Sequence, residues 1–197
     1  MIRAHVVAFV VMVVCSGCTS QRAAPSDRES EPGTELSTTP ADPSPQLPRA
    51  IRVDVISRVG ASPETTAFAA YVRARTASFL AGSATPSLRV HTTERELRRQ
   101  QGLVTSAVES GFTVPAQPRV ALVGRQRVAS DATVLGVCLY LPSTEYVDAI
   151  TGDSPYGDVP QRWQAAVVRL VSSPVTWKVD KVVPPPKAGG PNCRGLD

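Results

Sequence analysis

The apolar side chains between residues 62 and 82 recur at helical spacing, which predicts an amphipathic helix. Ser62 suits the N-cap, Pro63 the first helical position, and Gly82 the end of the helix. The predicted buried stripe consists of Ala67, Phe68, Tyr71, Val72, Arg75, Phe79 and Leu80. The helix therefore packs one side against the rest of its domain.

A second helix is predicted between Thr93 and Gly111. Thr93 and Glu96 have the spacing of a capping box, in which each side chain binds a backbone N–H at the start of the helix. Its apolar face is predicted to contain Leu97, Gln101, Val104 and Val108. The stretch around Pro86, between the two helices, is predicted to be a polar loop.

After Pro115 the apolar period becomes strand-like. Strands are predicted at residues 119–123 (extending toward 128), 132–141, 161–171 and 175–179, with a short one at 51–56. Residues 132–141 are nearly all apolar, so both faces of that strand should be covered, by helices or by a dimer partner. The proline run after residue 183 prevents further pairing.

Two helices followed by an antiparallel meander predict an α+β domain over residues 51–197, with both helices on one face of a curved antiparallel sheet. This order, together with Val137-Cys138-Leu139, Trp177-Lys178-Val179 and a closing cysteine, resembles the nuclear-transport-factor-2-like or cystatin-like cone. It looks especially like small lipoproteins of high-GC Gram-positive bacteria that carry this cone. The long loop at 143–160 and the strand at 51–56 depart from that pattern.

The N-terminus has the layout of a secretory signal, with Arg3, an apolar run over residues 6–14 and small residues before Cys18. The run is about half the 20 residues that a membrane span needs. Its end resembles the lipobox of bacterial lipoproteins, except that Cys15 stands where that family has an aliphatic residue. The resemblance implies that residues 1–17 are removed and that Cys18 receives lipid. An ordinary signal peptide or a plain anchor helix is the alternative.

Residues 18–50 are predicted to be the lipidated cysteine and a disordered tether. The segment is rich in Ser, Thr and Pro and has few large apolar side chains, so it buries too little surface to offset its ordering entropy. It would hold the domain away from the bilayer. The predicted location is therefore the extracytoplasmic face of the cell membrane, anchored by lipid.

The chain has a formal net charge of +4, and its cations are too dispersed for a nucleic-acid-binding surface. Such an excess favours contact with anionic headgroups or wall polymers. If Cys15 is removed and Cys18 is lipidated, only Cys138 and Cys193 remain. An oxidising compartment favours a disulfide between them, and two free buried thiols are the alternative.

No residue set in the sequence indicates a catalytic, cofactor or metal site. His91 is the single histidine after the predicted signal, which excludes multi-histidine metal sites, and we expect it on the surface. The cone fold does include isomerases and dehydratases with a pocket carboxylate and a tyrosine. The residues that could line such a pocket here are Tyr140, Asp148, Trp163 and Trp177. Packing and solvation roles explain the same four residues.

The sequence therefore favours a non-enzymatic envelope lipoprotein whose domain binds a partner protein or a small apolar ligand. The alternative is a cone-fold enzyme, which requires an acid, such as Asp148, buried in an apolar pocket with a raised pKa. A third hypothesis is a wall-associated protein that uses its basic surface.

Overall fold

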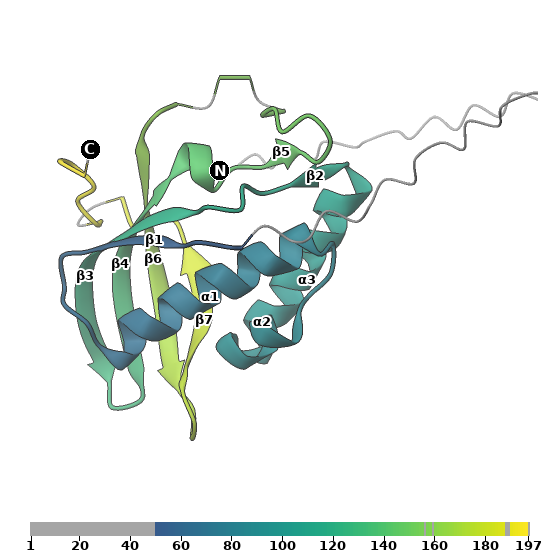
Figure 1. Cartoon of the computed structure of the whole chain (residues 1–197). Coiled ribbons are helices and arrows are strands. Elements are labelled where there is room, and N and C mark those ends of the chain that lie inside the picture. Colours follow the sequence, from purple (N-terminus) through teal and green to yellow (C-terminus); the bar gives the residue numbers. More distant parts are fainter. Residues whose placement is uncertain (1–49, 156, 159, 188–189, 197) are drawn as a thin grey trace, which may run out of the picture. The chain divides into compact units, whose positions relative to one another are not determined.

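The computed structural model describes residues 50–196 except 156, 159, 188 and 189, and the predicted signal peptide, Cys18 and nearly all of the tether lie outside them. Five strands form a sheet in the order β1-β3-β4-β6-β7. The strands are β1 (Asp54–Ser57), β3 (Arg119–Ala129), β4 (Ala132–Tyr140), β6 (Trp163–Ser172) and β7 (Trp177–Val183). Helices lie on one face of this sheet, which confirms the predicted α+β class (Figure 1).

The first predicted helix is α1 (Pro63–Leu80). Ser62 caps it as predicted, and the Ser62 hydroxyl accepts from the Thr65 N–H at 3.3 Å. Phe68, Tyr71 and Phe79 are at most 3 % exposed, but Leu80 is 42 % exposed, so the predicted stripe stops one residue short.

A short helix, α2 (Pro86–His91), replaces the predicted polar loop. The Thr85 hydroxyl accepts from the Leu88 N–H, and Pro86 occupies the first turn, where its missing N–H costs nothing. Leu88 is fully buried, so one apolar anchor holds this helix against the domain. A single buried position has no period, which is why the apolar pattern did not indicate a helix here.

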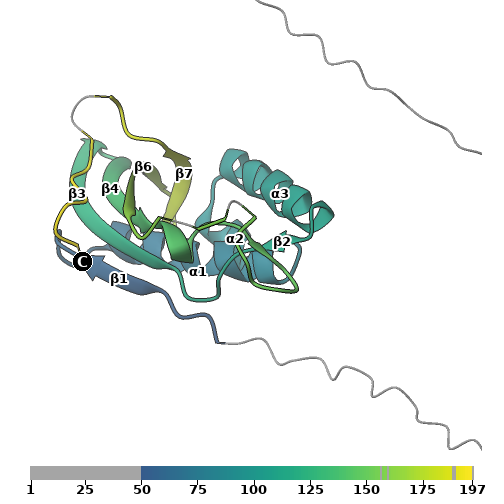
Figure 2. The ribbon, with the colours of Figure 1, turned by 90° about the horizontal axis from the view of Figure 1, so that it is seen from above.

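The next helix is α3 (Glu94–Glu109), and it lies beside β7 (Figure 2). Thr93 is the N-cap, as predicted. The buried face differs from the prediction by one position, because it contains Gln100 and Ala107, whereas Val108 is 51 % exposed. A polar network at Gln100, described below, is the reason.

The sheet contains one parallel pair, which corrects the prediction of a wholly antiparallel sheet. Strand β1 runs parallel to the first half of β3, and Asp54 pairs with Arg119 in register. The three helices lie between the two strands in sequence, so they form the crossover that a parallel pair requires. The remaining neighbours in the sheet are antiparallel, as predicted.

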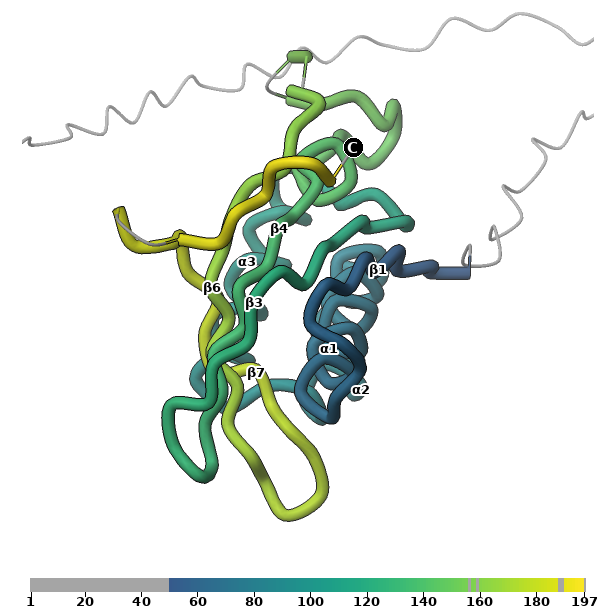
Figure 3. Tube along the Cα trace, turned by 90° about the vertical axis from the view of Figure 1, so that its left-hand side faces the viewer, coloured from purple at the N-terminus to yellow at the C-terminus, as the bar shows by residue number. Residues whose placement is uncertain are grey.

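Strand β4 is buried on its inner face and partly covered on its outer face, where Cys138 is buried but Val134 and Tyr140 are partly exposed. Its inner side chains, such as Leu135 and Val137, pack under the helices. On the outer face, Cys138 forms a disulfide with Cys193, and Leu196 packs beside it. The cover at Cys138 is therefore the C-terminal tail of the same chain, which crosses the sheet in Figure 3.

The long segment after β4 begins with the 3-10 turn η1 (Leu141–Ser143). It then forms β5 (Val147–Asp148), which pairs with β2 (Phe112–Thr113) in a separate two-stranded sheet. No helix among the described residues is long and apolar enough to cross a bilayer.

Candidate functional site

A cavity of about 180 Å³ lies between the helices and the sheet, and we call it the helix–sheet cavity. Phe68 and Val72 of α1 contribute one wall, and Val120 of β3 and Leu139 of β4 contribute the opposite wall. The remaining apolar lining consists of Leu103, Val114, Pro118 and Val182. The strand residues among them, Val120, Leu139 and Val182, lie on the face of the sheet that the helices cover.

Polar groups join the apolar lining of this cavity. Arg75 and Arg99 come from the two long helices, and Glu145 comes from the loop after η1. The other polar lining residues are Tyr71, Thr76, Ser143, Thr144 and Gln164. An apolar space with a few polar groups is the usual composition of a small-molecule site.

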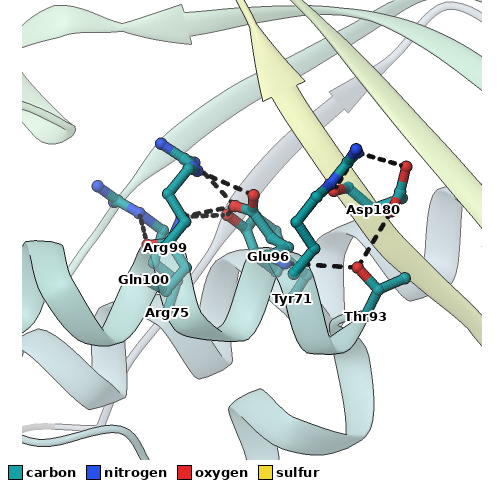
Figure 4. A network of polar contacts seen from close by, with 8 residues as sticks. Tyr71, Arg75, Thr93, Glu96, Arg99, Gln100 and Asp180 are labelled. Carbon is teal, nitrogen blue, oxygen red and sulfur yellow. Dashed lines mark hydrogen bonds and ion pairs between the residues drawn. The ribbon is translucent and has the colours of Figure 1, made fainter.

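A buried polar network joins α1 to α3 beside the cavity (Figure 4). The Tyr71 hydroxyl donates to Oε1 of Glu96 at 3.1 Å. The amide nitrogen of Gln100 donates to the same carboxylate oxygen at 2.7 Å. Glu96 is 1 % exposed and Gln100 fully buried, so these hydrogen bonds replace the water that both groups lose on folding.

Two arginines complete the network from the side of the cavity. Arg99 donates to both oxygens of Glu96, at 2.9 and 2.8 Å, which gives the buried carboxylate a bidentate cation. Nε of Arg75 donates to Oε1 of Gln100 at 3.2 Å, and its guanidinium carbon lies 4.7 Å from the centre of the Phe79 ring. Figure 4 shows both guanidinium groups extending in the same direction from neighbouring helices.

The network changes the ionisation of its members. Burial raises the pKa of Tyr71, Arg75 opposes that rise, and the charge of Glu96 adds to it. The hydrogen bonds to Glu96 raise the pKa of Arg99. Tyr71 is therefore a neutral donor and Arg99 a fixed cation across the physiological range of pH.

Two of the four predicted pocket residues meet, but away from the cavity. Tyr140 and Trp163 are paired across β4 and β6, with their ring centres 5.3 Å apart. The guanidinium carbon of Arg119 lies 4.7 Å from the Tyr140 ring, and the Tyr140 hydroxyl donates to Gln161. Trp163 packs with the outer cluster beside Cys138, so this group belongs to the outer face of the sheet.

Asp148 and Trp177 lie elsewhere. Oδ1 of Asp148 accepts from the backbone N–H groups of Ile150 and Thr151, at 2.8 and 2.7 Å, and these hydrogen bonds lower the pKa of Asp148. Asp148 thus caps a surface turn. Trp177 packs at the edge of the main core, at the opposite end of β6 from Trp163 and on the other face. The four residues do not form one pocket.

His91 lies at the end of α2 and is half-buried, not in a surface loop as predicted. Its Nδ1 is buried without a hydrogen-bond partner among the described residues. Burial lowers the pKa of His91, and the nearby Lys178 lowers it further. No group of three potential metal ligands occurs among the described residues.

Sequence reasoning did not identify Arg75, Glu96 or Gln100 as site residues. A signal was present for Arg75, because it occupies a position of the apolar stripe where a cation needs a specific partner. Glu96 was interpreted as a capping residue, and the structure uses its carboxylate for Tyr71, Arg99 and Gln100 instead.

No protein-family model matches this chain, and no curated protein matches it either. A solved structure with some likeness is the intermembrane space region of the chloroplast protein ARC6. It aligns with a TM-score of 0.35 and 14% sequence identity, over 64% of this chain and 99% of that chain.

Proposed function

We propose that this chain is a lipid-anchored envelope protein whose domain binds a small apolar ligand in the helix–sheet cavity. The observation that carries the proposal is the cavity itself, an apolar space of about 180 Å³ between two packed layers. Other hollows formed by the described residues are no smaller, but they are more open to solvent and less apolar, so this cavity is the one suited to an apolar ligand. An engineered apolar cavity of about 150 Å³ binds benzene, which sets the scale of the ligand.

We propose that the domain binds its ligand and does not catalyse a reaction. The acidic groups beside the cavity are Glu96, which is occupied by Tyr71, Arg99 and Gln100, and Glu145. Asp148, the carboxylate that the enzyme hypothesis named, caps a surface turn. The acid that the enzyme hypothesis named therefore lies outside the cavity.

The location we propose is the extracytoplasmic face of the cell membrane, with Cys18 as the lipid attachment site. The disulfide between Cys138 and Cys193 supports an oxidising compartment, where such bonds form and persist. The resemblance to nuclear-transport-factor-2-like lipoproteins is part of the same proposal. A membrane anchor would hold the cavity where apolar molecules leave or enter a bilayer.

Calorimetric titration with straight-chain alcohols from butanol to decanol tests the cavity. Each added methylene should raise the affinity about fourfold while it is buried. The gain should stop at the chain length that fills the cavity, because further carbons stay in water. A gain that continues unchanged to decanol, or no binding at any length, would contradict an enclosed site.

A substitution that fills the cavity, compared with one on the other face of the same strand, tests whether the cavity is the binding site. Val182 lines the cavity from β7, whereas its neighbour Val183 projects to the other face of the sheet. Val182→Phe should weaken binding of the best alcohol at least about tenfold, since it occupies the ligand's space. Val183→Phe should leave the affinity within about twofold. Equal effects of the two substitutions would remove the cavity as the binding site.

The anchor has its own test. Intact-mass analysis of the mature protein should find a mass increase from lipid that is lost in Cys18→Ala. Membrane fractionation should find less of the mutant in the membrane, and any mutant that stays there should retain residues 1–17, since their apolar run is the alternative anchor. Lipid mass that persists in the mutant would exclude Cys18 as the attachment site.

A further inference from the structure

We propose that the ligand of the helix–sheet cavity is a small amphiphile with a carboxylate at one end, and that Arg75 binds this carboxylate. The inference rests on the proposed function and adds the chemical class of the ligand. It starts from the only lining cation that has no carboxylate partner among the described residues. Arg99 lines the same cavity, but its charge is balanced by Glu96 at 2.8 Å.

Arg75 presents two donor groups that no described residue engages. Its Nε donates to Gln100, and its ring contact is with Phe79. Neither Nη has a hydrogen-bond partner among the described residues, and no described carboxylate lies within 4.0 Å of the guanidinium. The two Nη groups form the planar fork that matches a carboxylate in a bidentate pair.

The position of Arg75 is fixed by the polar network. Glu96 only accepts hydrogen bonds, so the amide nitrogen of Gln100 must face it, at 2.7 Å. The amide oxygen of Gln100 is then left to accept from Nε of Arg75. Gln100 is therefore a positioning residue, and its amide orientation leaves the Nη fork unengaged beside the cavity.

The environment of the fork suits a charge-assisted contact. Arg75 is half-buried, and Phe68, Val72 and Val120 form the apolar space next to it. A carboxylate placed there gains a partner in a partly dry site, where charged hydrogen bonds contribute more than they do in water. The apolar chain of the same ligand would fill the cavity.

Glu145 lines the same cavity and carries the opposite charge. It forms no ion pair within 4.0 Å with Arg75 or Arg99. A bound carboxylate is repelled by Glu145, so this residue should lower the affinity for an anionic ligand and leave that for a neutral one unchanged. Removing the charge of Glu145 is therefore a second test of the same site, in which the affinity for a carboxylate should rise.

The experiment compares the alcohol of optimal chain length with the carboxylate of the same length, by calorimetric titration of the purified protein at pH 7. The carboxylate should bind about tenfold or more tightly than the alcohol, because it gains a charged pair with Arg75. Arg75→Met should remove this preference and change the affinity for the alcohol less than about twofold. Glu145→Gln should increase the preference.

Arg73 supplies the matched control, since it is an exposed arginine of α1 and does not line the cavity. Arg73→Met should leave both affinities unchanged. Arg75→Lys keeps the charge without the planar fork and should retain part of the preference. Because the wild-type comparison of the two ligands needs no substitution, it tests the inference even if Arg75→Met does not fold.

The outcomes separate the two proposals. If the alcohol binds and the carboxylate binds no more tightly, the ligand class proposed here is wrong and the cavity function stands. If neither ligand binds, the cavity function and this inference both fall. If Arg73→Met and Arg75→Met weaken the carboxylate equally, the effect is general surface charge and Arg75 is not its site.

Discussion

Pro191 of the C-terminal tail packs directly on Gly136 of β4, so that a Cβ at Gly136 would lie 3.1 Å from the proline Cγ. Two residues further along both segments, Cys138 is bonded to Cys193. The tail therefore lies on the outer face of β4 at these two residues, and it continues across the sheet to Leu196, which packs with Ala121 of β3. A proline contact and a disulfide thus hold the C-terminal tail against β4.

Gly136→Ala should destabilise the domain by about 1 kcal/mol, and Gly136→Val by about 1–3 kcal/mol, because the added carbons overpack against Pro191. Gly124 is the control, since it pairs with Gly136 in register and a Cβ there would make only ordinary contacts at 3.9 Å. Urea unfolding measures the difference. Equal losses for Gly124→Ala and Gly136→Ala would assign the effect to glycine in a strand, not to the tail.

Replacing both cysteines of the disulfide by alanine should lower the free energy of unfolding by about 4 kcal/mol, as the chain-entropy relation gives for a loop of this length. The sequence separation is 55 residues. A reducing agent should destabilise the wild type by a similar amount and leave the double mutant unchanged. A wild type that is insensitive to complete reduction would contradict this role of the bond.

Tyr71 should make the domain sensitive to alkali. Burial raises the pKa of Tyr71 above its usual value of about 10. The contribution of Tyr71 to the free energy of unfolding is therefore fully present below that pH. It declines as the pH rises further, because the unfolded chain loses the tyrosine proton before the folded chain does. Tyr71→Phe should flatten this decline between pH 9 and 11 and cost about 1 kcal/mol at pH 7 through the lost hydrogen bonds. Urea midpoints measured across this range check it, and parallel declines for both proteins would contradict it.

Glu64 should make the domain sensitive to acid, as Tyr71 makes it sensitive to alkali. Burial acts to raise the pKa of Glu64, but its own N–H, the Ser62 hydroxyl, Arg125 and Arg127 hold it below the usual value. The contribution is present above the unfolded pKa of about 4.3 and is lost as the pH falls through the folded pKa.

Glu64→Gln should therefore flatten the loss of stability below pH 5 and cost up to about 1 kcal/mol at pH 7. The matched control is Glu94→Gln, a first-turn carboxylate of α3 whose side chain is 71% exposed and forms an ion pair with Arg98. Thermal unfolding between pH 3 and 7 measures both. A Glu94 variant with the same flattening would mean that helix position, and not the Arg125 and Arg127 pair, sets the effect.

Much of the fold could be predicted because its signals are local. Ser62 and Pro63 mark the start of α1, and the apolar stretches at 119–123 and 132–141 mark two strands that the structure contains. The cysteine count predicted the bond between Cys138 and Cys193, which is present. Each of these features depends on neighbours in sequence or on simple counting.

The candidate site was not predictable in the same way. Tyr71 and Gln100 are 29 residues apart in sequence, and their contact at 3.0 Å exists only after α1 and α3 have packed. That contact also explains the error in the face of α3. An apolar pattern favours Val108 over Gln100, whereas a buried amide with all its hydrogen bonds can occupy a core position.

The sequence by itself determined the helix starts, the strands, the available cysteine pair and the signal-like N-terminus, because caps, periods and composition act over a few residues. The tertiary structure alone decided the parallel place of β1, the tail over β4, and the separation of Tyr140 and Trp163 from Asp148 and Trp177. It also decided that Arg75 lines a cavity. These features depend on which surfaces meet when the layers pack, and no local pattern records that choice.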